Sequence, residues 1–119
     1  FINHCGEMPL AYSLADVVVS ASIEPEAFGR IAVESQSMSK PIIASNIGGS
    51  KETVLNKKTG FLYKHDDPRE LAKSLNTVIQ LSQEELKLMG NEGRKNVAKK
   101  FDVELMCDSN LREYKKLLK

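Results

Sequence analysis

Two glutamates eight residues apart, Glu26 and Glu34, are the residues whose type and spacing best suit a binding site. Glu26 lies in a run of alanine, serine, glutamate and proline that is typical of a loop, and Phe28-Gly29 opens a segment with helical spacing. From Gly29 to Glu34 a helix rises about 7.5 Å. One carboxylate therefore precedes the predicted helix, and the other lies about a turn and a half into it.

The start of this helix has the chemistry to hold a phosphate, because it offers free backbone N–H groups and a partial positive charge. Gly29 has no side chain and lets an anion approach closely. A carboxylate can accept hydrogen bonds from the paired hydroxyls of a ribose. A site for a nucleotide-sugar must hold a phosphate, a ribose and a second polyol close together. Glutamates near a helix start also interact favourably with its dipole, so spacing alone leaves a purely structural role open.

Short apolar runs alternate with helical patterns along the chain. We predict strands at 16–20, 41–45 and 60–63, and the end of a further strand at 1–5. We predict helices at 8–15, 28–38 and 51–55, and after caps at Asp67, Ser82 and Asp102. The glycines at 90 and 93 weaken the helix after Ser82. This alternation predicts an α/β fold, a parallel sheet with helices on both faces. Ligands then bind beyond the carboxyl ends of the strands, in loops 20–28 and 45–52.

Composition is that of one ordinary globular domain. The chain has 119 residues, 41% hydrophobic and 28% charged. Its 17 basic and 16 acidic residues give a net charge of +1, which provides no case for nucleic-acid binding. Cys5 and Cys107 are expected to be reduced thiols of a cytoplasmic protein. His4 and His65 have no partner at metal-ligand spacing, so no metal site is predicted.

The stretch from Glu26 to Glu34 closely resembles the E-x7-E signature of retaining GT-B glycosyltransferases, especially family four, the glycosyl transferases group 1. The pattern continues in register through Lys40–Ser45, Ile47-Gly48-Gly49, Glu52 and Thr59–Leu62, and the similarity covers about residues 10 to 80. The resemblance implies that residues 1–119 form part of the C-terminal, nucleotide-sugar-binding domain, a Rossmann-like half of a GT-B fold. The sequence begins at Phe1 with residues typical of a strand. We therefore expect an upstream part and an N-terminal domain.

The resemblance also implies roles for individual residues. Glu26 would be the catalytic residue that contacts the transferred sugar, helped by the backbone amides of Phe28 and Gly29, and Glu34 would bind the ribose. Ser22 and Ile23 would line the loop that holds the base or sugar, and Arg30 would lie close to the phosphate. Gly48 and Gly49 would shape the adjacent turn. No cofactor and no divalent metal are expected.

The partners that the resemblance implies are a UDP-, GDP- or ADP-sugar as donor and a glycan or lipid-linked acceptor, bound through the N-terminal domain. The parent enzyme would act with retention in polysaccharide or lipopolysaccharide biosynthesis, in the cytoplasm at the cytosolic face of a membrane. The family's basic pair for the diphosphate lies upstream, so we expect this chain alone to bind donor without catalysis. Its last helix, with Tyr114, Leu117 and Leu118, would cross to the N-terminal domain, and the isolated chain would self-associate.

Two other functions stay open at this stage. A GT-B epimerase acting on a UDP-sugar is disfavoured because that class lacks Phe-Gly between the two glutamates. A non-catalytic nucleotide-binding or interaction module would use the same glutamates only to stabilise a helix start.

Overall fold

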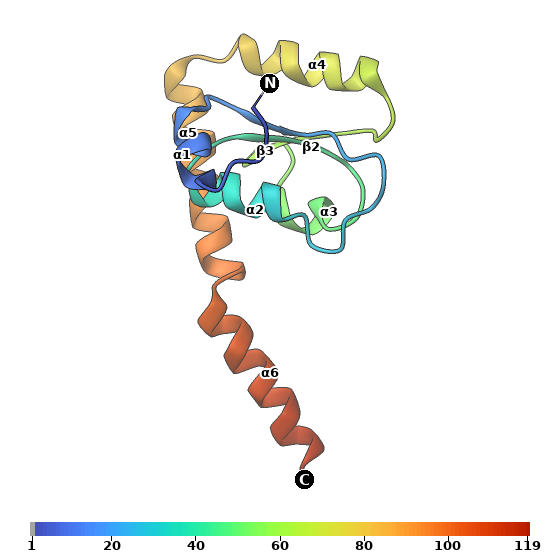
Figure 1. Cartoon of the computed structure of the whole chain (residues 1–119), viewed down its shortest axis with the longest axis vertical. Coiled ribbons are helices and arrows are strands. Elements are labelled where there is room, and N and C mark those ends of the chain that lie inside the picture. The colour runs from blue at the N-terminus through green and yellow to red at the C-terminus, as the bar shows by residue number, and fades with distance from the viewer. Residues whose placement is uncertain (1) are drawn as a thin grey trace.

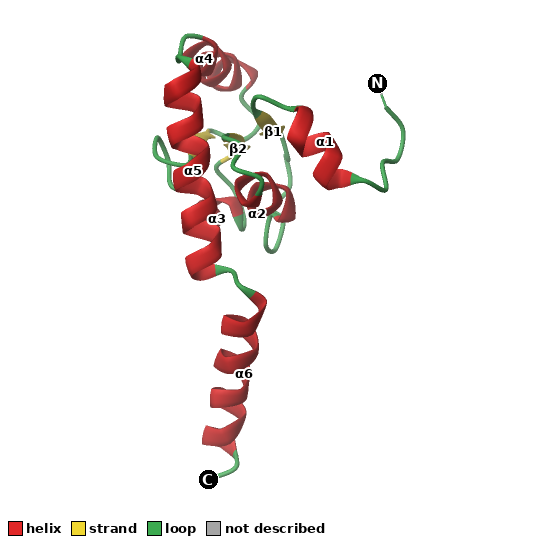
Figure 2. Cartoon of the chain, turned by 90° about the vertical axis from the view of Figure 1, so that its left-hand side faces the viewer, coloured by secondary structure: helices red, strands yellow, loops and turns green. Residues whose placement is uncertain are grey.

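In the computed structural model, which describes residues 2–119, helices flank a three-stranded parallel sheet (Figures 1 and 2). The strands lie side by side in chain order and are β1 (Val18–Ser20), β2 (Ile42–Ser45) and β3 (Gly60–Tyr63). The helices are α1 (Met8–Leu14), α2 (Arg30–Ser37), α3 (Ser50–Thr53), α4 (Pro68–Ile79), α5 (Gln83–Lys100) and α6 (Val103–Leu117). Because all three strands are parallel, their carboxyl ends lie at one edge of the sheet.

The two faces of β2 belong to two separate apolar clusters, because successive side chains of a strand point to opposite sides. Ile42 and Ala44 pack with Ala32 of α2 on one face. Ile43 packs with Val78 of α4 on the other. In Figure 1, α4 accordingly lies on one side of the strands, and α2 and α3 lie on the opposite side. The predicted α/β fold with helices on both faces of a parallel sheet is confirmed.

The predicted helix starts are confirmed at all three caps. Asp67 accepts hydrogen bonds from the first-turn amides of α4. Ser82 and Glu85 form the reciprocal capping box of α5. Asp102 accepts from the amide of Glu104 at the start of α6.

The strand predicted at residues 1–5 is wrong for the part that the structure describes, since residues 2–5 are not extended into the sheet; Phe1 lies outside the described residues. In Figure 2 this segment runs beyond α1, away from the strands. A strand needs a hydrogen-bonding neighbour, and Ile2 is almost wholly exposed here.

The two glycines of α5 bring this helix close to α2 instead of weakening it. A side-chain carbon at Gly90 would overlap the carbonyl of Ser39, and one at Gly93 would lie 3.0 Å from Cγ of Gln36. Both glycines are buried. The close packing of two helices therefore offsets the intrinsic cost of glycine in a helix.

A buried polar network joins α2, α3 and α5. The Gln36 amide nitrogen donates to the carbonyls of Ala32 at 2.8 Å and Thr53 at 2.9 Å. The Asn96 amide nitrogen donates to the same Thr53 carbonyl at 3.1 Å and to Oε1 of Gln36 at 3.3 Å. Buried polar groups that are satisfied in this way fix the relative positions of the elements that carry them. The network thus holds α2, on which Glu34 lies.

Helix α6 projects away from the body of the molecule (Figures 1 and 2), and none of its residues, all of which the structure describes, is buried. The molecule consequently measures 55 × 30 × 28 Å. Its exposed apolar side chains include Val103, Met106, Leu111, Tyr114 and Leu117. Over residues 2–119, no helix combines the length and apolarity needed to cross a membrane.

Candidate functional site

The loops that follow β1 and β2 meet at the carboxyl edge of the sheet. Ser20, the last residue of β1, is in register with Ala44 of β2, so the two chains leave the sheet side by side. The amide of Gly49 then donates to the carbonyl of Glu26 at 2.8 Å. The main chain of the second loop therefore supports the main chain of the loop that carries Glu26.

Only glycine fits at the two positions where these loops touch. Gly48 has a φ of 56°, which L side chains rarely adopt, and a side-chain carbon there would lie 2.8 Å from the nitrogen of Glu26. At Gly49 such a carbon would lie 2.7 Å from Cα of Phe28. Real Cβ atoms essentially never come closer than 3.0 Å to another heavy atom. The Gly48-Gly49 turn thus shapes the loop from Glu26 to Phe28, which agrees with the sequence prediction for this pair.

Gly29 is the residue that precedes α2, with a left-handed φ of 74°. Within residues 2–119, no side chain caps this helix. The Ala32 N–H donates to the Gly29 carbonyl at 3.1 Å, so the N–H groups before it are the ones left for water or an external acceptor. An anion is the acceptor that the helix dipole favours. The phosphate-binding chemistry predicted from the sequence is therefore available at the start of α2.

Glu34 is held from two sides. The Tyr12 hydroxyl of α1 donates to Glu34 Oε2 at 2.8 Å. The Arg30 guanidinium, one turn earlier on α2, donates to Oε1 at 3.0 Å. The two partners differ in environment, because Tyr12 is only 5% exposed and the Arg30 side chain is 83% exposed. Burial, with the hydrogen bond to Glu34, raises the pKa of Tyr12 to about 12.

Glu26 extends into solvent from the loop after β1, and Ser22 lies beside it. The Ser22 hydroxyl donates to Glu26 Oε1 at 2.5 Å. Ile23, 66% exposed, lines a cavity of about 150 Å³ together with Tyr63 at the end of β3. Of the residues predicted from the resemblance, Ser22, Ile23, Glu26 and Phe28 thus lie in one loop, whereas Arg30 and Glu34 lie on α2.

Phe28 contacts the junction between α5 and α6. Its ring meets that of Phe101 edge to face, with 5.5 Å between ring centroids. An apolar groove of about 400 Å³ continues from this pair along the start of α6, lined also by Val103, Leu105 and Met106. The loop that carries Glu26 is therefore braced on one side by glycines and on the other by an aromatic ring.

Tyr12 and Phe101 are the two residues of the site that the sequence analysis did not single out. Tyr12 lies within the predicted helix 8–15, where only the apolar positions were considered. A phenol in such a helix combines an apolar body with a polar tip, which is the signal that could have identified it.

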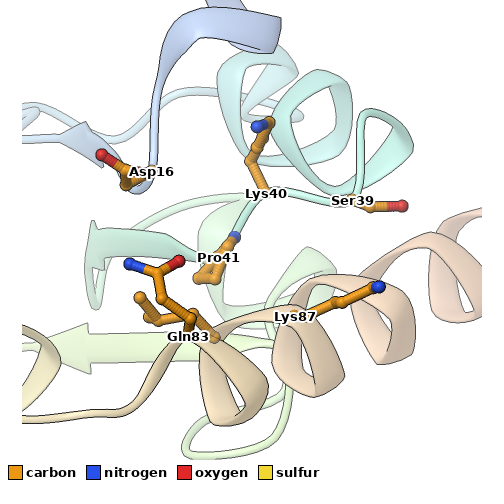
Figure 3. Close-up of a pocket in the computed structure, with 7 residues that line it drawn as sticks. Asp16, Ser39, Lys40, Pro41, Gln83 and Lys87 are labelled. Carbon is orange, nitrogen blue, oxygen red and sulfur yellow. The ribbon is translucent and has the colours of Figure 1, made fainter.

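A second cavity, of about 290 Å³, lies at the opposite edge of the sheet (Figure 3). Pro41 and Asp16 place it at the amino ends of β2 and β1. Its charged side chains point in different directions in Figure 3, and the Lys40 ammonium donates to the carbonyl of Ser13 at 3.0 Å. Such a cavity lacks convergent polar groups, so we place the candidate site at the carboxyl edge.

The carboxyl-edge site offers backbone N–H groups, two carboxylates and a hydroxyl. Carboxylates accept hydrogen bonds from sugar hydroxyls, and helix N–H groups donate to phosphate. Across the described residues 2–119, no group of three or more His, Cys, Asp or Glu side chains is arranged to hold a metal ion. Cys5 and Cys107 are both free.

Comparison with known proteins gives one consistent result. The family model described as "Glycosyl transferases group 1" matches residues 1–96. The capsular polysaccharide biosynthesis glycosyltransferase CapM of Staphylococcus aureus is 32% identical over 119 residues, which cover 99% of this chain and 30% of CapM.

Solved structures agree with this match. A glycosyltransferase from Rickettsia africae superimposes with a TM-score of 0.89 at 39% identity, covering 100% of this chain and 31% of that chain. Anabaena Alr3699/HepE, solved in complex with UDP-glucose, superimposes with a TM-score of 0.89 at 27% identity, covering 98% of this chain and 32% of that one. The chain spans about a third of the length of these relatives.

Proposed function

This chain belongs to the glycosyl transferases group 1, and on that premise we propose that it is part of the nucleotide-sugar-binding domain of a retaining glycosyltransferase. The observation that carries the proposal is the pair of carboxylates on either side of the uncapped start of α2. Glu26 precedes that start in the loop, and Glu34 follows it on the helix. The UDP-glucose complex of the similar HepE supports a nucleoside-diphosphate sugar as the donor.

Each residue of the proposed site has a chemical task. Glu34 accepts hydrogen bonds from the ribose hydroxyls. Glu26, steadied by Ser22, contacts the transferred sugar and is the catalytic residue, with the backbone amides of Phe28 and Gly29 close by. Arg30 is exposed on the first turn of α2, within reach of a phosphate bound at that end. Ile23 lines the same loop on the side of the base or sugar.

The proposed parent enzyme transfers a hexosyl group to a glycan or lipid-linked acceptor with retention of configuration and without a divalent metal. The similarity to CapM supports an acceptor of polysaccharide biosynthesis. We place the parent enzyme in the cytoplasm, at the cytosolic face of the membrane. The acceptor site and the basic pair for the diphosphate belong to other parts of the parent, so the 119 residues alone are expected to bind donor without transfer.

Helix α6 is proposed to pack on the N-terminal domain of the parent. Its apolar side chains are exposed in this chain: Tyr114 is 65% exposed and Leu117 is 82% exposed. An apolar surface of this kind favours association, so the isolated chain is expected to self-associate through α6.

Titration of the chain with UDP, GDP, ADP and UDP-glucose, followed by amide chemical shifts, tests the proposal. We expect one nucleotide to shift amides clustered at residues 22–34. Glu34→Gln, which keeps the shape of the side chain, should weaken the nucleotide about tenfold or more through loss of charged hydrogen bonds. Glu84→Gln, on the exposed first turn of α5, is the matched control and should leave nucleotide affinity unchanged.

Glu26→Gln tests the binding of the sugar separately from the binding of the nucleotide. It should remove the additional affinity of UDP-glucose over UDP and leave UDP binding unchanged. A folded chain that shows no shift with any of the four ligands, or shifts confined to residues outside 22–34, would overturn the proposed function.

A further inference from the structure

We propose that Tyr12 of α1 is a positioning residue that holds the Glu34 carboxylate in the orientation that binds ribose. The proposal rests on the function proposed above, because it takes Glu34 as the ribose ligand. It adds a residue from a helix outside both site loops.

The Tyr12–Glu34 hydrogen bond joins two helices whose relative position is fixed. The hydroxyl and Oε2 are 2.8 Å apart, across 22 residues of sequence and between two helices. Tyr12 is 5% exposed, so packing holds its ring. The amino group of Lys40, just after α2, donates to the carbonyl of Ser13, the residue after Tyr12. Helix α1 is thus tied to the end of α2, and the phenol has one direction in which to donate.

Arg30 does not provide an equivalent support. Its bond to Oε1 joins an exposed pair four residues apart on one helix, and such pairs contribute little free energy. The guanidinium can leave for a phosphate with little penalty, whereas the buried phenol cannot leave Glu34 without losing its partner.

The hydrogen-bonding capacity of Glu34 matches a ribose once Tyr12 and Arg30 are in place. A carboxylate has about four lone-pair sites, two on each oxygen. Tyr12 occupies one site on Oε2, and Arg30 occupies one on Oε1. One site on each oxygen remains, and a ribose presents two adjacent hydroxyls. The carboxylate can therefore accept both hydroxyls at once, provided that its plane does not rotate.

The phenol keeps its proton under all ordinary conditions, because burial and Glu34 raise the pKa of Tyr12 to about 12. It acts only as a donor toward Glu34. The carboxylate is therefore held by a partner whose protonation does not vary over the range in which an enzyme works.

Tyr12→Phe tests the proposal, with Tyr114→Phe as the control. Tyr114 lies on α6 outside the site and is 65% exposed, so its variant also loses one phenol hydroxyl. Affinities are measured by calorimetry for UDP and for 3′-deoxy-UDP. We expect Tyr12→Phe to weaken the ribonucleotide about tenfold and to remove most of its advantage over the deoxy analogue. Tyr114→Phe should change neither quantity.

A ligand-free measurement accompanies the binding data. Ultraviolet titration of the phenols should assign the highest pKa to Tyr12, and Glu34→Gln should lower it. If Glu34→Gln weakens the ribonucleotide but Tyr12→Phe binds both ligands like wild type, the positioning role is overturned and the proposed function stands. If the wild-type chain does not distinguish the ribonucleotide from its deoxy analogue, the ribose role of Glu34 fails, and the positioning role fails with it.

Discussion

Replacing Gly49 with alanine tests whether the turn after β2 holds the loop of Glu26 in place by contact. The new Cβ would overlap the carbonyl group of Phe28, which is nearer than its Cα at 2.7 Å, whereas ordinary contact begins at 3.4 Å. The two segments must therefore separate by roughly 1 Å in a close-packed environment. Gly49 has an ordinary φ of −62°, so the substitution strains no dihedral angle. Overpacking of this kind costs about 1–3 kcal/mol. In a chain of this length that lowers the melting temperature by roughly 4–12 °C.

The displaced segment carries Glu26, so recognition of the donor sugar should suffer more than recognition of the nucleotide. A misplacement of about 1 Å can reduce a rate about 100-fold. We therefore expect the parent enzyme's kcat/KM to fall by about 10- to 100-fold. In the chain itself, the extra affinity of UDP-glucose over UDP should shrink while UDP affinity is retained.

Calorimetry with both ligands, thermal unfolding and the amide shifts of residues 22–29 measure these effects. Gly6→Ala is the control, because no described atom comes within 4 Å of a side-chain carbon at that position. A Gly49→Ala chain with wild-type amide shifts from Glu26 to Phe28 and unchanged UDP-glucose affinity would refute the reasoning.

Three further outcomes are expected. Gly90→Ala should push α5 from the Ser39 carbonyl and lower the free energy of unfolding in urea by about 1–3 kcal/mol; a loss no larger than that of Gly6→Ala would contradict the close packing. The pKa of Tyr12 is about 10 unfolded and about 12 folded, so the folded chain keeps a proton that the unfolded chain loses. Stability present below pH 10 should therefore fall by as much as about 2–3 kcal/mol toward pH 12 in urea titrations, and by less in Tyr12→Phe; an equal fall in both chains would contradict the shift at Tyr12. Removal of residues 102–119 should abolish the self-association of the chain in sedimentation velocity, and equal association of both chains would place the contact elsewhere.

Local signals made the fold predictable. The caps at Asp67 and Ser82 lie within three residues of the amides they serve, so the sequence window that contains them contains the whole interaction. Strand β2 is a fully buried run that begins with two β-branched isoleucines, and its neighbours on the two faces follow from alternation.

Contacts between distant segments were not predictable in the same way. Gly90 and Gly93 indicate a weak helix by propensity, and only the approach of α2 shows why glycine is required there. The strand predicted at residues 1–5 depended on a sheet neighbour that a sequence pattern cannot provide.

The same difference between local signals and distant contacts applies to the candidate site. The spacing of Glu26 and Glu34 placed one carboxylate in a loop and the other on a helix, as the structure has them. The buried partner of Glu34 is Tyr12, 22 residues earlier, and no local pattern connects the two. Ser22 was assigned to the base or sugar from the resemblance, whereas its hydroxyl contacts Glu26. Its role toward a ligand stays a prediction.

The contact between the two site loops joins backbone to backbone. The Gly48-Gly49 turn bears on the main chain of Glu26 and Phe28, and the bond from the Gly49 amide ends on a carbonyl. The path of the loop therefore depends little on which side chains it carries at positions such as Ile23 or Ala27. Evolution, or a protein engineer, can exchange those side chains to suit a different sugar while the loop keeps its course, provided that the two glycines are retained.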